Sequence, residues 1–138
     1  MKVFLDTNVV LDFLGERDPF YQNALQIITM SRVIKQIEIT ISSLTVINVA
    51  YILRRSFSKD SVISKLKSFL EICNISSIDE HIIIEAINAD SYDFEDKVQQ
   101  LSAVSADADI IITRDENGFT DCEIPVFTPS EFMEKVQE

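Results

Sequence analysis

Glycine is almost missing from this chain of 138 residues, which contains only Gly15 and Gly118. Phosphate-binding loops of the GxGxxG and GxxxxGK(S/T) types need several closely spaced glycines, because backbone N–H groups must approach the phosphate. The sequence therefore excludes both loops. It has no tryptophan and one histidine, His81, which we expect at the surface. Catalysis by a histidine triad and a metal site rich in histidine are excluded as well.

Cysteines and long apolar runs are also scarce. Cys73 and Cys122 lie far apart without a CxxC spacing, and no histidines complete a zinc site with either of them. We expect two free thiols in a reducing cytoplasm. No apolar stretch reaches the ~20 residues that a membrane span needs, and no basic region precedes an apolar run at the N-terminus. These observations predict a cytoplasmic protein without membrane contact.

Positive charge is in short supply, because 12 Lys and Arg face 23 Asp and Glu, a formal net charge of -11. Such a charge opposes non-specific binding to nucleic acid, so a polyanionic partner would need a local basic patch or bridging cations. Residues 54–67 contain five basic residues and one acid. We interpret Arg54, Arg55 and Lys59 as a surface that follows phosphates or binds a partner. The alternative is an ordinary solvated helical face.

Short apolar strands alternate with amphipathic helices from end to end of the chain, which is 46% hydrophobic and has the usual size of one domain. The patterns predict strands over 2–5, 38–41, 74–78, 109–113 and 124–128, and helices over 19–35, 44–55, 58–71, 79–88, 93–106 and 130–136. The helix over 44–55 is apolar almost all round and should be central and buried. This alternation indicates an α/β/α sandwich with a mostly parallel sheet, and we expect one domain over 1–138.

Acidic residues follow two of the predicted strands. Asp6 ends the first strand, and Asp115 comes two residues after Thr113 at the end of a later one. Asp93 and Asp96 stand three residues apart at a helix start, where at least one could face the strand ends. Ligands of open parallel sheets bind beyond these ends, and acids gathered there would raise at least one pKa unless a cation lay between them. Oxygen ligands of this kind suit Mg²⁺ or Mn²⁺.

Each acid also has a structural explanation. Asp6 and Asp93 could cap the helices that follow them, and Asp115 could be a turn residue. A phosphotransfer enzyme or receiver with Asp6 as its nucleophile is a further reading. Against it, Asn8 stands where a DxD pattern needs a second acid, and no lysine directly follows either late strand.

Four stretches, LDTNVVLDFL, ISSLTVINVAYILRR, DFEDKVQQLSA and IIITRDENGF, resemble the motifs of the PIN domain in order and spacing. The resemblance spans almost the whole chain. It implies a ribonuclease that depends on Mg²⁺ or Mn²⁺, similar to the VapC-type toxins of toxin–antitoxin pairs, in which an activated water hydrolyses a phosphodiester of RNA. It also implies a homodimer and, if the chain is a toxin, a small antitoxin protein as partner.

The resemblance assigns site residues by motif. It places catalytic and metal-binding acids at Asp6, Asp96 and Asp115. Asp93 joins them as a further candidate metal ligand. Thr113 and Asn8 match supporting positions, one beside the last acid and one in the loop after the first strand. On this reading the basic residues Arg54, Arg55 and Lys59 bind RNA or a partner protein.

The chain departs from the PIN pattern at one position. The second acid of the family, commonly a glutamate in the central helix, aligns with Asn48 in TVINVAY. An amide can donate an oxygen to a metal but brings no negative charge. The alternative function is therefore a catalytically weakened PIN scaffold that binds RNA or a partner protein.

Overall fold

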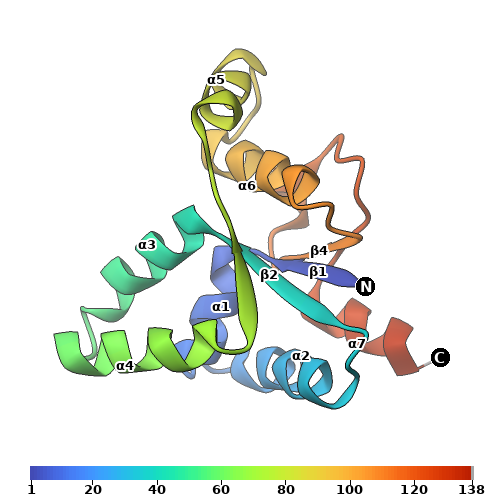
Figure 1. The fold of residues 1–138 in the computed structure, drawn as a ribbon. Coiled ribbons are helices and arrows are strands. Elements are labelled where there is room, and N and C mark those ends of the chain that lie inside the picture. Colours follow the sequence, from blue (N-terminus) through green and yellow to red (C-terminus); the bar gives the residue numbers. More distant parts are fainter. Residues whose placement is uncertain (138) are drawn as a thin grey trace.

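The computed structural model describes residues 1–137 and shows one parallel sheet with strand order β3-β2-β1-β4-β5 (Figure 1). The strands are β1 (Lys2–Leu5), β2 (Glu38–Ser42), β3 (Cys73–Ser76), β4 (Ile110–Ile112) and β5 (Val126–Phe127). Every pair of neighbouring strands is parallel. The predicted α/β fold with a mostly parallel sheet is confirmed, with β5 shorter than predicted.

The connections between strands are mostly helical. The helices are α1 (Thr7–Leu14), α2 (Tyr21–Val33), α3 (Ser43–Leu53), α4 (Lys59–Leu70), α5 (Glu80–Asn88), α6 (Phe94–Ser105) and α7 (Pro129–Gln137), with a short 3-10 helix η1 (Glu116–Phe119). The prediction that α2 starts near residue 19 was wrong by two residues, because residues 18–20 form a turn. The sequence analysis missed η1, since four residues are too few to show a helical period.

The sheet buries side chains on both faces, which makes a three-layer sandwich. Val3 and Leu5 of β1 pack into a core with α1, α2, α3, α4 and α7. Phe4, which points to the opposite face, packs with Ala103 of α6 and with η1. Figure 1 shows the α5–α6 pair on one side of the strands and α1, α2 and α7 on the other.

The helix α3 is not buried all round, so this part of the sequence analysis was wrong. Thr45, Val49 and Leu53 face the core, but Ile47 and Tyr51 are 67% and 69% exposed. Apolar composition alone therefore misjudged the burial of α3, because only one of its faces packs on other elements.

The sheet extends to β2 and β3 on one side of β1 and to β4 and β5 on the other. The strand order therefore reverses between β1 and β4, which lie side by side at the centre of the sheet. The connections before β3 cover one face, whereas α6, which precedes β4, packs on the other. Crevices at such switch points lie beyond the carboxyl ends of the strands and commonly hold ligands. Within residues 1–137, no helix combines the length and apolar character of a membrane span.

Candidate metal-binding site

Asp6 lies buried at the carboxyl end of β1, and its backbone N–H donates to Ile112 O of β4 at 3.0 Å. Its side chain caps α1, because Oδ1 accepts from Thr7 N at 2.8 Å. Oδ2 accepts from the Thr113 hydroxyl at 2.8 Å and from Asn8 Nδ2 at 3.4 Å. Burial raises the pKa of Asp6 above its ordinary value, although hydrogen bonds to both oxygens oppose this rise. The carboxylate is thus held in one orientation at the strand end.

Gln99 is a site residue that the sequence analysis missed. It lies on α6, three residues after Asp96 and therefore on the same side of the helix, and it is only 1% exposed. Its Nε2 donates to Asp6 Oδ1 at 3.0 Å and to the Thr45 hydroxyl at 2.8 Å, while its Oε1 accepts from Ser42. The amide ties α6 to the ends of β1 and β2. The sequence carried no distinct signal for this role, because Gln99 lies between Val98 and Gln100 and its partners are far away along the chain.

Asp96 lies half-buried in the first turn of α6. Burial raises its pKa to about 7, and the charges of neighbouring acids add to this rise. In order of decreasing effect, these acids are Asp6, Asp93, Asp115 and Glu95. The expectation that clustered acids would raise at least one pKa is confirmed. Because cations bind the deprotonated form, a divalent ion would compete with a proton at Asp96 near neutral pH.

Gly118 makes room for the Asp96 side chain. A Cβ atom at position 118 would lie 1.7 Å from Asp96 Oδ2 and 2.7 Å from its Cγ. Gly118 belongs to η1, which follows Asp115, so its close approach brings the loop of one acid onto the helix of another. The sequence analysis missed this role, although Gly118 is one of only two glycines in the chain.

Thr113 and Asn8 connect Asp6 to the loop that carries Asp115. Thr113 is fully buried, and its hydroxyl accepts from Asp115 N at 3.1 Å. Asn8 donates from Nδ2 to Thr113 Oγ1 at 3.2 Å, and its Oδ1 accepts from Arg114 N at 3.2 Å. Both residues that the resemblance assigned to support therefore lie between acids, while Asp115 is exposed.

A partly buried ion pair anchors the same loop on α1. Arg114 donates to the Asp12 carboxylate from Nε at 2.6 Å and from Nη2 at 3.3 Å, and Asp12 is 1% exposed. Arg17 lies 3.3 Å from the same carboxylate, and the Arg114 guanidinium lies 3.8 Å from the centre of the Phe20 ring. The position of Asp115 thus depends on a charged pair that the sequence analysis did not identify.

The acids supply suitable oxygen donors but do not close around an ion. Among residues 1–137, no three His, Cys, Asp or Glu side chains converge closely enough to hold one metal. Asp93 accepts from Asp96 N at 3.0 Å, which is the capping role named as its alternative. The donor set still fits Mg²⁺ or Mn²⁺ in kind, because these hard ions bind through few carboxylates and keep several waters.

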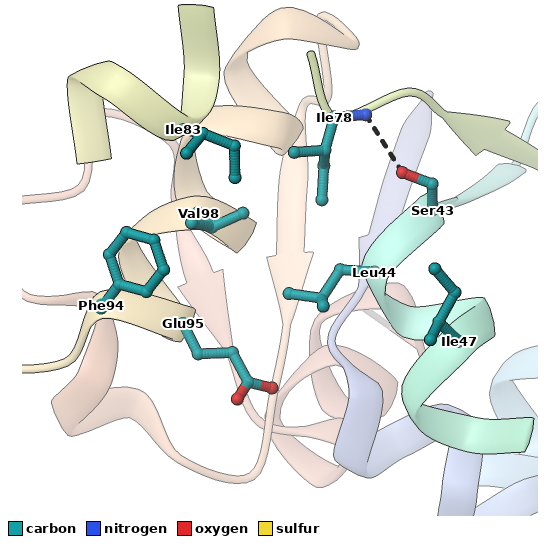
Figure 2. A pocket seen from close by; sticks show the side chains of 8 residues that line it. All are labelled: Ser43, Leu44, Ile47, Ile78, Ile83, Phe94, Glu95 and Val98. Carbon is teal, nitrogen blue, oxygen red and sulfur yellow. Dashed lines mark hydrogen bonds between the residues drawn. The ribbon is translucent and has the colours of Figure 1, made fainter. Parts of the chain in front are cut away.

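Asn48 lies half-buried on α3 and donates from Nδ2 to Glu95 Oε1 of α6 at 2.9 Å. Glu95 stands at the edge of an apolar pocket of about 360 Å³ between α3, α5 and α6 (Figure 2). The other residues that line it are Ser43, Leu44, Ile47, Ile78, Ile83, Phe94 and Val98. The pocket itself is hydrophobic, so the polar groups of the candidate site lie outside it, past the Glu95 side chain.

The basic residues Arg54, Arg55 and Lys59 are exposed where α3 ends and α4 begins. In the described part of the chain, none of them forms an ion pair with an acid. The helix α3 starts beside Gln99, which donates to Asp6, and it ends at these cations. At 1.5 Å per residue, the two ends of α3 lie roughly 15 Å apart.

Comparisons with known proteins identify the family of the chain. A family model described as "PIN domain" matches residues 2–117. The chain is 28% identical to Ribonuclease VapC1 of Aquifex aeolicus (strain VF5) in an alignment of 138 positions that covers 97% of this chain and 94% of that protein. The toxin–antitoxin complex from Klebsiella pneumoniae is similar with a TM-score of 0.66 at 19% identity, covering 92% and 97% of the two chains.

A third relative is VapC20 of Mycobacterium tuberculosis, a toxin that cleaves the sarcin–ricin loop. Its structure is similar with a TM-score of 0.63 at 11% identity, and the match covers 79% of this chain and 86% of that one. At this identity the likeness supports the fold alone. The family model, by contrast, spans most of the chain, including Asp6, Asp96 and Asp115. The chain therefore belongs to the PIN domain family.

Proposed function

We propose that this chain is a Mg²⁺- or Mn²⁺-dependent ribonuclease that hydrolyses single-stranded or structured RNA, with Asp6, Asp96 and Asp115 as its catalytic acids. One observation carries the proposal. Acids from β1, α6 and the loop after β4 approach one another at the carboxyl edge of the sheet, close enough to contribute to an Asp96 pKa of about 7. The similarity to Ribonuclease VapC1 supports both the reaction and an RNA substrate.

The residues of the site prepare it for hydrolysis by water. Asp6 presents a carboxylate of fixed orientation, because Gln99 and Thr113 donate to its two oxygens. Asp96 gives up its proton as a cation binds. A bound Mg²⁺ or Mn²⁺ would orient the scissile phosphate, lower the pKa of the attacking water and stabilise the leaving oxygen. No protein nucleophile is needed, and Cys73 is unsuited to that role because burial raises its thiol pKa to about 12.

We further propose that residues 1–138 form one PIN domain that acts in the cytoplasm as a homodimeric toxin with a small antitoxin protein as partner. The toxin–antitoxin complex from Klebsiella pneumoniae supports the partner. Exposed apolar side chains on α3 and α5 supply surface for protein contacts, since Ile47, Tyr51 and Ile87 are each more than 60% exposed. A neighbouring open reading frame for a small DNA-binding protein would support the pairing.

The alternative is a PIN scaffold that has lost catalysis and binds RNA or a partner protein. Asn48 favours it, because the wild-type chain has an amide where the family commonly has a glutamate. The two functions differ in whether the acids bind a metal and whether RNA is cleaved.

Metal linkage and RNA cleavage test the proposal together. Millimolar Mn²⁺ should raise the melting temperature of the wild-type chain by binding the folded state. The rise should shrink in Asp6→Asn and Asp96→Asn but not in Asp60→Asn, which changes an exposed acid in the first turn of another helix, α4. Cleavage of single-stranded RNA should require the ion and fall at least about a hundredfold in the two site variants.

Two outcomes would contradict the proposal. An equal Mn²⁺-induced rise of the melting temperature in the wild type and both site variants would contradict the proposed metal site. A normal metal response without any cleavage of single-stranded or structured RNA would favour the scaffold.

A further inference from the structure

A hydrogen bond joins Asn48 of α3 to Glu95 of α6. Asn48 Nδ2 donates to Glu95 Oε1 at 2.9 Å, and Asn48 is half-buried whereas Glu95 is exposed. Position 48 is the position at which the PIN resemblance places an acid. The structure therefore puts a carboxylate within hydrogen-bond distance of the place where the family acid is missing.

Glu95 also lies among the charges of the candidate site. It directly precedes Asp96 in the first turn of α6, where the positive end of the helix dipole favours a carboxylate. Asn48, which holds Glu95, lies one helical turn after Thr45, and the Thr45 hydroxyl accepts from Gln99, the amide that also donates to Asp6. In Figure 2 the Glu95 carboxylate points away from Val98 and Ile83, which line the apolar pocket. Its polar end thus lies outside the hydrophobic part of that pocket.

We propose that Glu95 supplies the acid that position 48 lacks, with Asn48 as the positioning residue that fixes its side chain. The inference rests on the proposed metal-dependent ribonuclease and adds a ligand to it. The negative charge has moved from α3 to α6, and the site keeps four acids, namely Asp6, Asp96, Asp115 and Glu95. Because the affinity of a site for hard cations depends on ligand charge, Glu95 strengthens metal binding. Asn48 is then part of the site, and its presence at position 48 does not indicate that catalysis has been lost.

Calorimetric titration of the metal-free full chain with Mn²⁺ tests this role without measuring activity. Glu95→Gln should weaken Mn²⁺ binding by about tenfold. The matched control is Glu80→Gln, which changes an exposed glutamate in the first turn of another helix, α5, and it should bind as the wild type does. Asn48→Ala should also weaken binding, but it should add little in the Glu95→Gln background, because both changes remove one interaction.

Exchange of the two side chains separates a missing charge from a damaged fold. Asn48→Glu/Glu95→Gln keeps one amide and one carboxylate in contact, so its Mn²⁺ affinity should return to within about threefold of the wild type. Asn48→Glu alone brings two carboxylates together and should not tighten binding. Melting curves without metal confirm that each variant folds.

The outcomes distinguish this inference from the proposed function. Equal Mn²⁺ affinity in the wild type and Glu95→Gln, with a loss in Asp96→Asn, would overturn the role of Glu95 alone. Tighter binding by Asn48→Glu than by the wild type would also overturn it, since position 48 would then be a vacant ligand position. A wild-type chain that binds no Mn²⁺ would overturn both proposals.

Discussion

At the scale of single residues, the site depends on small groups that let acids approach one another. Gly118 is needed because it has no side chain, since a Cβ at this position would overlap the Asp96 carboxylate. Gln99 matters through both ends of its amide, which donate to Asp6 and accept from Ser42. Neither residue is acidic, yet together they decide where two of the acids lie.

The residue-scale prediction concerns Gly118→Ala. The added methyl must displace the end of the Asp96 side chain, which is flexible, so the unfolding free energy should stay within about 1 kcal/mol of the wild type. Mn²⁺ affinity and RNA cleavage should each fall by about tenfold, because the displaced group is a proposed ligand. Asn117→Ala in the same 3-10 helix is the control and should change neither. Unaltered Mn²⁺ affinity in Gly118→Ala would show that Asp96 does not bind the metal.

At the scale of elements, α3 runs from the candidate site to the basic residues. At its N-terminal end, Ser42 and Thr45 hydrogen-bond to Gln99, which donates to Asp6, and its C-terminal end leads to Arg54, Arg55 and Lys59. Roughly 15 Å separates the two ends, so under the proposed function these cations would hold an RNA backbone away from the acids. In a chain with a net charge of -11, RNA binding needs such a local basic surface.

The element-scale prediction replaces these three cations with alanine. Affinity for single-stranded RNA should fall, and the slope of its logarithm against the logarithm of salt concentration should flatten by about 2, because each phosphate contact contributes roughly 0.7. The control Arg32→Ala/Lys35→Ala/Lys135→Ala removes the same charge from exposed positions outside the α3–α4 junction. Equal salt slopes for the two triple variants would assign the patch to ordinary solvated surface. Cleavage of a saturating short substrate should change little in either variant.

At the scale of the whole molecule, the raised acid pKa values link folding stability to pH. Asp96 holds its proton in the folded state up to a pKa of about 7, whereas its ordinary value is 3.8, and the pKa of Asp6 is shifted in the same direction. Between these values the folded state binds more protons than the unfolded state. The contribution of Asp96 to stability is therefore complete below about pH 4 and is lost as the pH rises through 7.

The whole-molecule prediction follows from this sign. In the presence of a chelator, wild-type protein should lose stability in urea unfolding as the pH rises from 5 to 8. Asp96→Asn, which resembles the protonated acid, should lose less over the same interval. The comparison corrects for the general repulsion of a chain with excess acid, which both proteins share. Parallel stability curves for the two proteins would show that the Asp96 pKa is not raised.

Most of the fold could be predicted from the sequence, because strands and helices leave local periodic patterns. The strand at Lys2–Leu5 lies where those patterns placed it, and the helix predicted over 79–88 is α5 (Glu80–Asn88). The errors are of a different kind. Ile47 and Tyr51 are apolar yet exposed, because burial depends on which elements pack against α3 and not on its own composition.

The sequence by itself determined the order of strands and helices, the family, and three acids at predicted strand ends or helix starts. Only the tertiary structure decided how these acids are connected. The contacts of Gln99 with Asp6, of Gly118 with Asp96 and of Asn48 with Glu95 join residues that are 93, 22 and 47 positions apart. Such contacts leave no local pattern, because they arise where separate helices cross the ends of the sheet, and that crossing is fixed by packing on both of its faces.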